Sequence, residues 1–73
     1  MSYFAFSSGT TVLNTGQVIV AHPLVTANSL VFVTGVDTGL NAGTLGVTVT
    51  GGSFTVKSVN LSDNRNINYL ILG

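Results

Sequence analysis

The chain contains no cysteine, no tryptophan and no glutamate, and it has only one proline and four charged residues among 73. Without cysteine it forms no disulfide. Ordinary soluble domains are about one quarter charged, whereas here the charges are Asp37, Lys57, Asp63 and Arg65, which sum to zero. A small domain with a net charge near zero tends to associate. We therefore expect a subunit whose surface is largely covered by partners.

The length allows one small domain with a modest core. A domain of this size buries only about 60% of the surface that its unfolded chain exposes. Small scaffolds compensate with disulfides, metals or oligomerisation, and one histidine with two isolated carboxylates makes a poor structural metal site. Oligomerisation is what remains, and a mean hydropathy of +0.59 suits it. No cofactor is expected.

The scarcity of charge and of long apolar runs also excludes several partners. Lys57 and Arg65 alone cannot neutralise a useful run of phosphates, so nucleic acid and anionic membranes are not expected. The longest apolar runs, residues 30–33 and 69–72, are far shorter than the ~20 residues of a membrane-spanning helix. Residues 1–8 lack the basic start and the apolar stretch of a signal peptide.

The residues that are abundant favour strands. Valine, threonine, isoleucine and aromatic residues suit pleated, half-buried surfaces. The clearest alternation runs through residues 45–50, where Leu45, Val47 and Val49 share one face. Gly51-Gly52 then predicts a hairpin turn, and the return strand places Phe54 and Val56 on one face. Further short strands are expected at residues 3–6, 12–13, 17–20, 30–34 and 67–72.

Turns and loops separate these strands. We expect turns at Gly16, at His22-Pro23 and at Asn28-Ser29, a long loop between residues 35 and 46, and a polar, solvated turn over residues 60–66. The run 30–34 is apolar on both faces and therefore predicts a central strand or an interface. The pattern predicts an all-β fold, a small antiparallel sandwich or barrel of six to seven short strands. Its domains are residues 1–8, an N-terminal arm or edge strand, and residues 9–73, a single β domain.

One tripeptide matches a catalytic motif. In dimeric aspartic proteases an Asp-Thr-Gly from each subunit meets its twin, and the two carboxylates activate water. Asp37-Thr38-Gly39 has that order, but the residues that follow differ, and Asp with Gly is equally what a turn requires. We interpret this segment as a turn.

Other candidate sites are weaker still. His22 stands alone, without the convergent ligands of a metal site or a spacing that proposes a serine partner. Residues 63–66 lack the glycine and terminal glutamate of a calcium loop. Asn60-Leu61-Ser62 matches a glycosylation sequon, which we interpret as coincidence. No catalytic or metal-binding residue is predicted, and the chain is not expected to be an enzyme.

Three ordered stretches resemble a known group of proteins. The segment 25–34, Val-Thr-Ala-Asn-Ser followed by an apolar run, resembles small β modules of tailed-bacteriophage virion proteins. A glycine-rich loop follows, then Gly52-Ser53-Phe54-Thr55-Val56-Lys57-Ser58, then a polar turn with Asp63 and the terminal strand 68–72. The resemblance covers residues 11–73. It implies a trimeric, β-rich virion module, found at tail-fibre tips or on the outside of heads.

Two functions from different classes follow. The first is a capsid decoration (cement) protein that binds the outer head surface and stabilises contacts between major capsid subunits; a chain without a preceding shaft favours it. The alternative is a tail-fibre or receptor-binding module that recognises a host surface glycan, with Tyr3, or Tyr69 beside Asn66 and Asn68, as the aromatic platform. A non-viral self-assembling β protein is a third possibility, because edge strands with few charges pair readily with strands of other chains.

The residues expected to carry the structural function form two groups. A capsid-contacting arm comprises Tyr3, Phe4 and Phe6. The core or the oligomer interface comprises Leu30, Phe32, Phe54, Val56, Tyr69 and Ile71.

Overall fold

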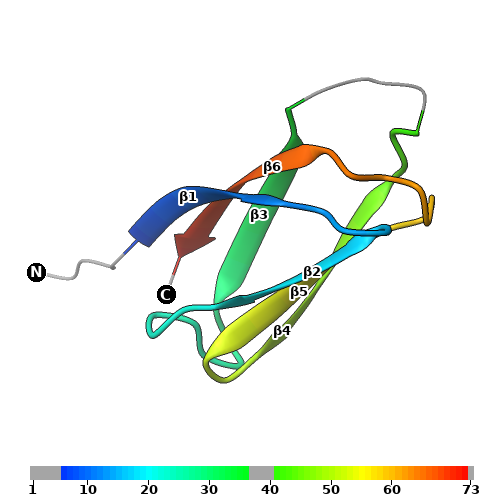
Figure 1. The fold of residues 1–73 in the computed structure, drawn as a ribbon. Coiled ribbons are helices and arrows are strands. Elements are labelled where there is room, and N and C mark those ends of the chain that lie inside the picture. The colour runs from blue at the N-terminus through cyan, green and yellow to red at the C-terminus, as the bar shows by residue number, and fades with distance from the viewer. Residues whose placement is uncertain (1–5, 37–40, 73) are drawn as a thin grey trace, which may run out of the picture.

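The computed structural model describes residues 6–36 and 41–72, which form two three-stranded sheets packed face to face (Figure 1). The first sheet has the order β1-β6-β3 and the second the order β2-β5-β4, with all neighbours antiparallel. The prediction of an all-β antiparallel fold with six to seven short strands is confirmed, and of the two architectures it is the sandwich. The strands are β1 Phe6–Val12, β2 Gln17–Ala21, β3 Leu30–Gly35, β4 Leu45–Thr50, β5 Ser53–Ser58 and β6 Asn66–Leu72.

The chain crosses repeatedly between the two sheets. It passes from β1 to β2, back to β3 and across again to β4, so that only β4 and β5 are joined within one sheet. β1 lies against β2 and β3 lies against β4, which leaves β6 and β5 in the middle of their sheets. The predicted hairpin joins β4 to β5 through Gly51 and Gly52, and Gly52 has a φ of +89°.

Alternation along the strands decides which side chains are buried. Successive residues of a strand point to opposite faces. In β2 to β6, the apolar side chains of one face point toward the other sheet. The buried apolar residues are Leu13, Val25, Phe54, Val56, Ile67 and Ile71. Partly buried residues packed against them are Val18, Val20, Val31, Val33, Leu45, Val47, Val49 and Tyr69.

Full burial on the strands belongs to the central pair. Among strand residues whose burial is described, the fully buried ones, such as Phe54 and Ile71, lie on β5 or β6, whereas the inward residues of the flanking strands are only partly covered. The apolar run 30–34 is therefore not a central strand, because β3 forms one edge of its sheet. Its outward side chains, Leu30 and Phe32, are exposed in the part of the chain that the structure describes.

β1 differs from the two short strands that the sequence predicts. A single strand runs from Phe6 to Val12 and pairs with β6 over its whole length. Residues 7–11 are polar, yet they form part of the strand because their backbone pairs with β6. The apolar side chains on this part of the sheet come from β6. The strand crosses the predicted domain boundary between residues 8 and 9, and residues 1–5 lie outside the described part of the chain.

Candidate interaction surface

The outer face of the β1-β6-β3 sheet carries a group of apolar side chains. The alternation that turns Val31 and Val33 inward turns Leu30 and Phe32 outward. Residues 30 and 72 are register partners, as are residues 32 and 70, so these pairs lie next to each other on the same face. We call Leu30, Phe32, Leu70 and Leu72 the β3–β6 patch.

The patch is open to solvent on its β3 side. Leu30 is 58% exposed and Phe32 is 56% exposed, while Leu70 and Leu72 are partly buried. An exposed apolar residue on its own is ordinary, but adjacent apolar residues on one sheet face are a feature of interaction sites. The fold places this group where no other element of the described chain covers it.

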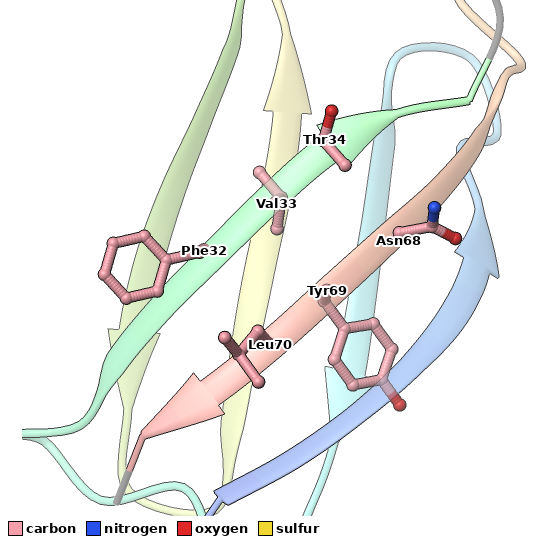
Figure 2. A pocket seen from close by; sticks show the side chains of 6 residues that line it. All are labelled: Phe32, Val33, Thr34, Asn68, Tyr69 and Leu70. Atoms are coloured by element: carbon pink, nitrogen blue, oxygen red, sulfur yellow. The ribbon is translucent and has the colours of Figure 1, made fainter.

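A shallow depression begins at the patch and continues into a polar band (Figure 2). Thr34 is opposite Asn68, and Asn68 is opposite Thr10 on the other side, so an amide and two hydroxyls cross the sheet. The depression has a volume of about 190 Å³. Its lining residues are Phe32, Val33, Thr34, Asn68, Tyr69 and Leu70.

The two outer faces of the sandwich differ in charge. β1, β6 and β3 contain no charged residue. The outer face of the other sheet carries Lys57, and around it threonines with Gln17. Ile19 is its large apolar exception, 63% exposed. A neutral face with an apolar group suits contact with protein or with the apolar face of a sugar ring.

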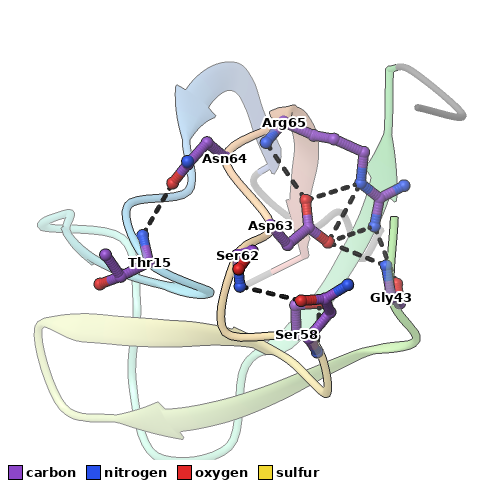
Figure 3. Close-up of polar contacts among 8 residues, drawn as sticks. Thr15, Gly43, Ser58, Ser62, Asp63, Asn64 and Arg65 are labelled. Atoms are coloured by element: carbon purple, nitrogen blue, oxygen red, sulfur yellow. Dashed lines mark hydrogen bonds and ion pairs between the residues drawn. The ribbon is translucent and has the colours of Figure 1, made fainter. Parts of the chain in front are cut away.

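At one end of the sandwich a buried ion pair fixes the loops (Figure 3). Asp63 is fully buried. Arg65 donates from Nε to Asp63 Oδ1 at 2.9 Å and from Nη2 to Asp63 Oδ2 at 2.9 Å. The amide of Gly43 donates to Oδ2 at 3.0 Å, and Arg65 Nη2 also donates to the Gly43 carbonyl at 2.8 Å. The pair therefore joins the segment before β4 to the segment before β6.

This network sets the charge state of Asp63. The hydrogen bond from the Arg65 side chain holds the pKa of the Asp63 carboxyl far below its usual range; burial opposes this, and the Gly43 amide and Ser58 add to the lowering. A carboxylate that is enclosed and engaged on both oxygens neither takes a proton from a substrate nor reaches a ligand. The sequence predicts a solvated turn here, and for Asp63 that prediction is wrong, because a guanidinium two residues away makes burial of the charge tolerable.

His22 has a serine neighbour that its spacing does not predict. Ser7 Oγ lies 3.2 Å from His22 Nε2, and the Leu24 amide donates to His22 Nδ1 at 3.2 Å. Since Nδ1 accepts, the proton of the neutral ring is on Nε2, which then donates to Ser7. A serine nucleophile needs the opposite arrangement, with Nε2 accepting and Nδ1 donating to an orienting group. The contact joins β1 to the segment after β2, and its polarity is that of a structural bond.

Two further observations concern metals and membranes. Within residues 6–36 and 41–72, no three histidine, aspartate or glutamate side chains come together to hold a metal ion. The same residues include no helix that is long and apolar enough to cross a bilayer.

The residues predicted for function fall into separate places. Phe54, Val56 and Ile71 lie in the core, with Tyr69 partly buried beside them, and Leu30 and Phe32 lie on the outer face. Tyr3, Phe4 and the Asp37-Thr38-Gly39 segment lie outside the described residues, and Phe6 is placed by its backbone as the first residue of β1.

Sequence reasoning missed the partners of Phe32 on the outer face. The alternation of the terminal strand does indicate that Leu70 and Leu72 point to the face opposite to Ile71. Only the strand order, however, shows that they lie beside Phe32 and Leu30 of β3. Asn68, proposed beside Tyr69 as part of a glycan platform, is on the outer face, whereas Tyr69 turns inward and packs edge-on against Phe54, with ring centroids 5.2 Å apart. The two residues therefore do not form one platform.

The chain matches a family of known proteins. The family model described as K1 capsule-specific polysaccharide lyase, C-terminal domain, matches residues 5–72. No curated protein and no solved structure matches the chain.

Proposed function

Because the chain belongs to the family of the K1 capsule-specific polysaccharide lyase C-terminal domain, we propose that it is a non-catalytic structural module on the tail of a phage particle. The family is related to phage tail spikes, which agrees with the expected phage virion module. On the particle, the module holds protein subunits together at or beside a protein that acts on capsular polysaccharide.

The tail location in this proposal rests on the family match, and the observation that carries the structural role is the neutral outer face of the β1-β6-β3 sheet. It presents adjacent apolar side chains, including Leu30 and Phe32, and no charge. The enclosed state of Asp63 and the donor role of His22 Nε2 support a non-catalytic module, since neither group is available as a base. A module with these properties would act by binding neighbouring protein subunits through this face.

The number and position of copies in purified particles test the proposal. We expect a handful of copies per particle, in proportion to tail proteins, and recovery with tails when heads and tails are separated on a gradient. Quantitative mass spectrometry with isotope-labelled peptides measures both. Hundreds of copies recovered with heads would replace the proposal by capsid decoration, the function in which the chain stabilises contacts between major capsid subunits.

The N-terminal arm belongs to the same experiment. If Tyr3, Phe4 and Phe6 attach the module to the particle, changing Phe4 and Phe6 to alanine abolishes incorporation while the domain stays folded. Incorporation at the level of the unaltered chain would contradict the arm, whereas loss of the fold would show that these residues belong to the domain.

Glycan recognition is the second candidate, and one observation favours it. The exposed Phe32 ring borders a depression that also contains Asn68 and Thr34, a combination of an aromatic face with amide and hydroxyl groups that suits a sugar. Titration with capsular oligosaccharides, followed by NMR shifts at Phe32 and Asn68, tests it. Asn68 shifts that vanish in Phe32→Ala and persist in Ile19→Ala would establish a saccharide site; no shift in the unaltered chain at millimolar sugar would exclude one.

A further inference from the structure

We infer that the β3–β6 patch is the contact surface for a second copy of this chain, arranged with the same face inward about an axis parallel to the strands. The inference names the partner of the surface on which the proposed structural function rests. It concerns association of the chain with itself, which is measured apart from any particle.

The contrast between the two outer faces is the first argument. Lys57 lies on the outer face of the β2-β5-β4 sheet, and the Asp63–Arg65 pair is enclosed among loops at one end. The patch face has only neutral residues on all three strands. Charged residues are depleted at the centres of protein interfaces and apolar residues are enriched there, so of the two faces this one has the composition of a contact.

The arrangement of groups along the face is the second argument, and it favours a copy over an unrelated partner. Leu30 with Leu72 and Phe32 with Leu70 form a mainly apolar half, beside which Ser8 lies on β1. Thr34, Asn68 and Thr10 form a mainly polar half, with Asn66 and the exposed Val12 at its far end. A rotation axis parallel to the strands leaves the position of each residue along the strand unchanged, so residues at the same position along the strand face each other in the two copies. The apolar half then meets an apolar half, and the polar half meets a polar half.

The polar half can satisfy itself in such a contact. The amide of Asn68 and the hydroxyls of Thr34 and Thr10 each donate and accept hydrogen bonds, so each can bond to the same residue of another copy. A charged group at these positions would instead meet its own sign. A face that lacks charge and is rich in groups that are both donor and acceptor is self-complementary in its chemistry.

The small core is the third argument. Six apolar residues are buried in the described chain, and there is no cysteine to add a disulfide. A standard interface covers about 800 Å² on each partner, and the chain exposes 4676 Å². A contact of standard size would therefore cover about one sixth of the exposed surface, and on this face it would cover Leu30 and Phe32.

Sedimentation equilibrium of the purified 73-residue chain tests the inference. We expect a mass of two or three chains at tens of micromolar. Phe32→Lys places a charge in the centre of the patch and should weaken association at least tenfold. Ile19→Lys is the matched control, because Ile19 is similarly exposed on a strand of the opposite outer face, and this variant should associate like the unaltered chain.

Several results would overturn the inference. They are a monomeric unaltered chain at several hundred micromolar, a Phe32→Lys variant that associates normally, and an Ile19→Lys variant that dissociates equally. A monomer whose Phe32 and Asn68 signals shift with added saccharide would assign the face to glycan instead. None of these results moves the particle measurement, so the tail location succeeds or fails separately.

A measurement without substitution guards against a variant that fails to fold. In a mixture of labelled and unlabelled chain, isotope-filtered NMR reports contacts between copies only. We expect intermolecular contacts from the Phe32 ring to leucine methyl groups of the other copy. Contacts that instead involve Ile19, Thr48 or Thr55 would place the interface on the opposite sheet and refute the inference.

Discussion

Gly9 lies directly opposite Tyr69 in the pairing of β1 with β6, and the tyrosine ring occupies the space where a side chain at residue 9 would be. A Cβ at this position would come within 2.5 Å of the Tyr69 hydroxyl oxygen and 2.7 Å of the ring carbon that bears it. The glycine in β1 is thus required by a ring on the neighbouring strand, which itself packs edge-on against Phe54.

We predict that Gly9→Ala destabilises the fold by about 1–3 kcal/mol, the usual cost of forcing extra volume into a packed site. Gly46→Ala is the control, since a Cβ at that position meets nothing within 4 Å. Urea unfolding at one fixed chain concentration measures both. Equal stabilities of the two variants would show that Tyr69 moves aside freely.

Truncation of Phe54 and of Phe32 should change the stability of the domain by very different amounts. Phe54 is completely buried at the centre of the core, so Phe54→Ala should cost about 3–5 kcal/mol. Phe32→Ala should change the stability of the isolated domain by well under 1 kcal/mol, because its ring is exposed. Dilute solution is essential here, since any association would add to the apparent stability. A large loss for Phe32→Ala under dilution would place that ring in the core.

The regular part of the fold could be predicted from the sequence because its signals are local. Leu45 to Thr50 alternate cleanly, two glycines follow, and Phe54 and Val56 continue the same face. The structure has that hairpin with those faces. In contrast, the polar residues 7–11 carry no such signal, and β1 is continuous only because β6 pairs with it and the Tyr69 ring requires Gly9.

The candidate surface could not be predicted because it depends on strand order. The run 30–34 is apolar on both faces, and this is expected both of a central strand and of an edge strand at an interface. Only the pairing of β3 with β6 shows that Leu30 and Phe32 face outward beside Leu72 and Leu70. Burial of Asp63 is non-local in the same way, because Gly43, twenty residues away, supplies one of its donors.

The ion pair should tolerate loss of its cation poorly. Arg65→Met leaves the enclosed Asp63 carboxylate without its main donors, and an unpaired buried charge is strongly destabilising. We expect a much lower unfolding midpoint than for Lys57→Met, a control that removes an exposed charge from a strand. Adding Asp63→Asn to Arg65→Met should restore part of the loss, since the charge is then absent. A double variant as unstable as the single one would mean that Arg65 acts through its packing alone.

The same pair predicts how stability depends on pH. The Arg65 side chain holds the pKa of Asp63 in the folded chain far below the value of about 3.9 expected when the chain is unfolded. The unfolded chain therefore binds a proton first as the pH falls, so the stabilisation by Asp63 is complete above about pH 5 and declines steadily below about pH 4. Asp37 is the only other carboxylate side chain, so the Asp37→Asn variant isolates the effect. Unfolding midpoints of this variant should fall between pH 5 and pH 2, and the additional change Asp63→Asn should flatten that fall; an equal fall with both changes would assign the acid sensitivity to groups other than Asp63.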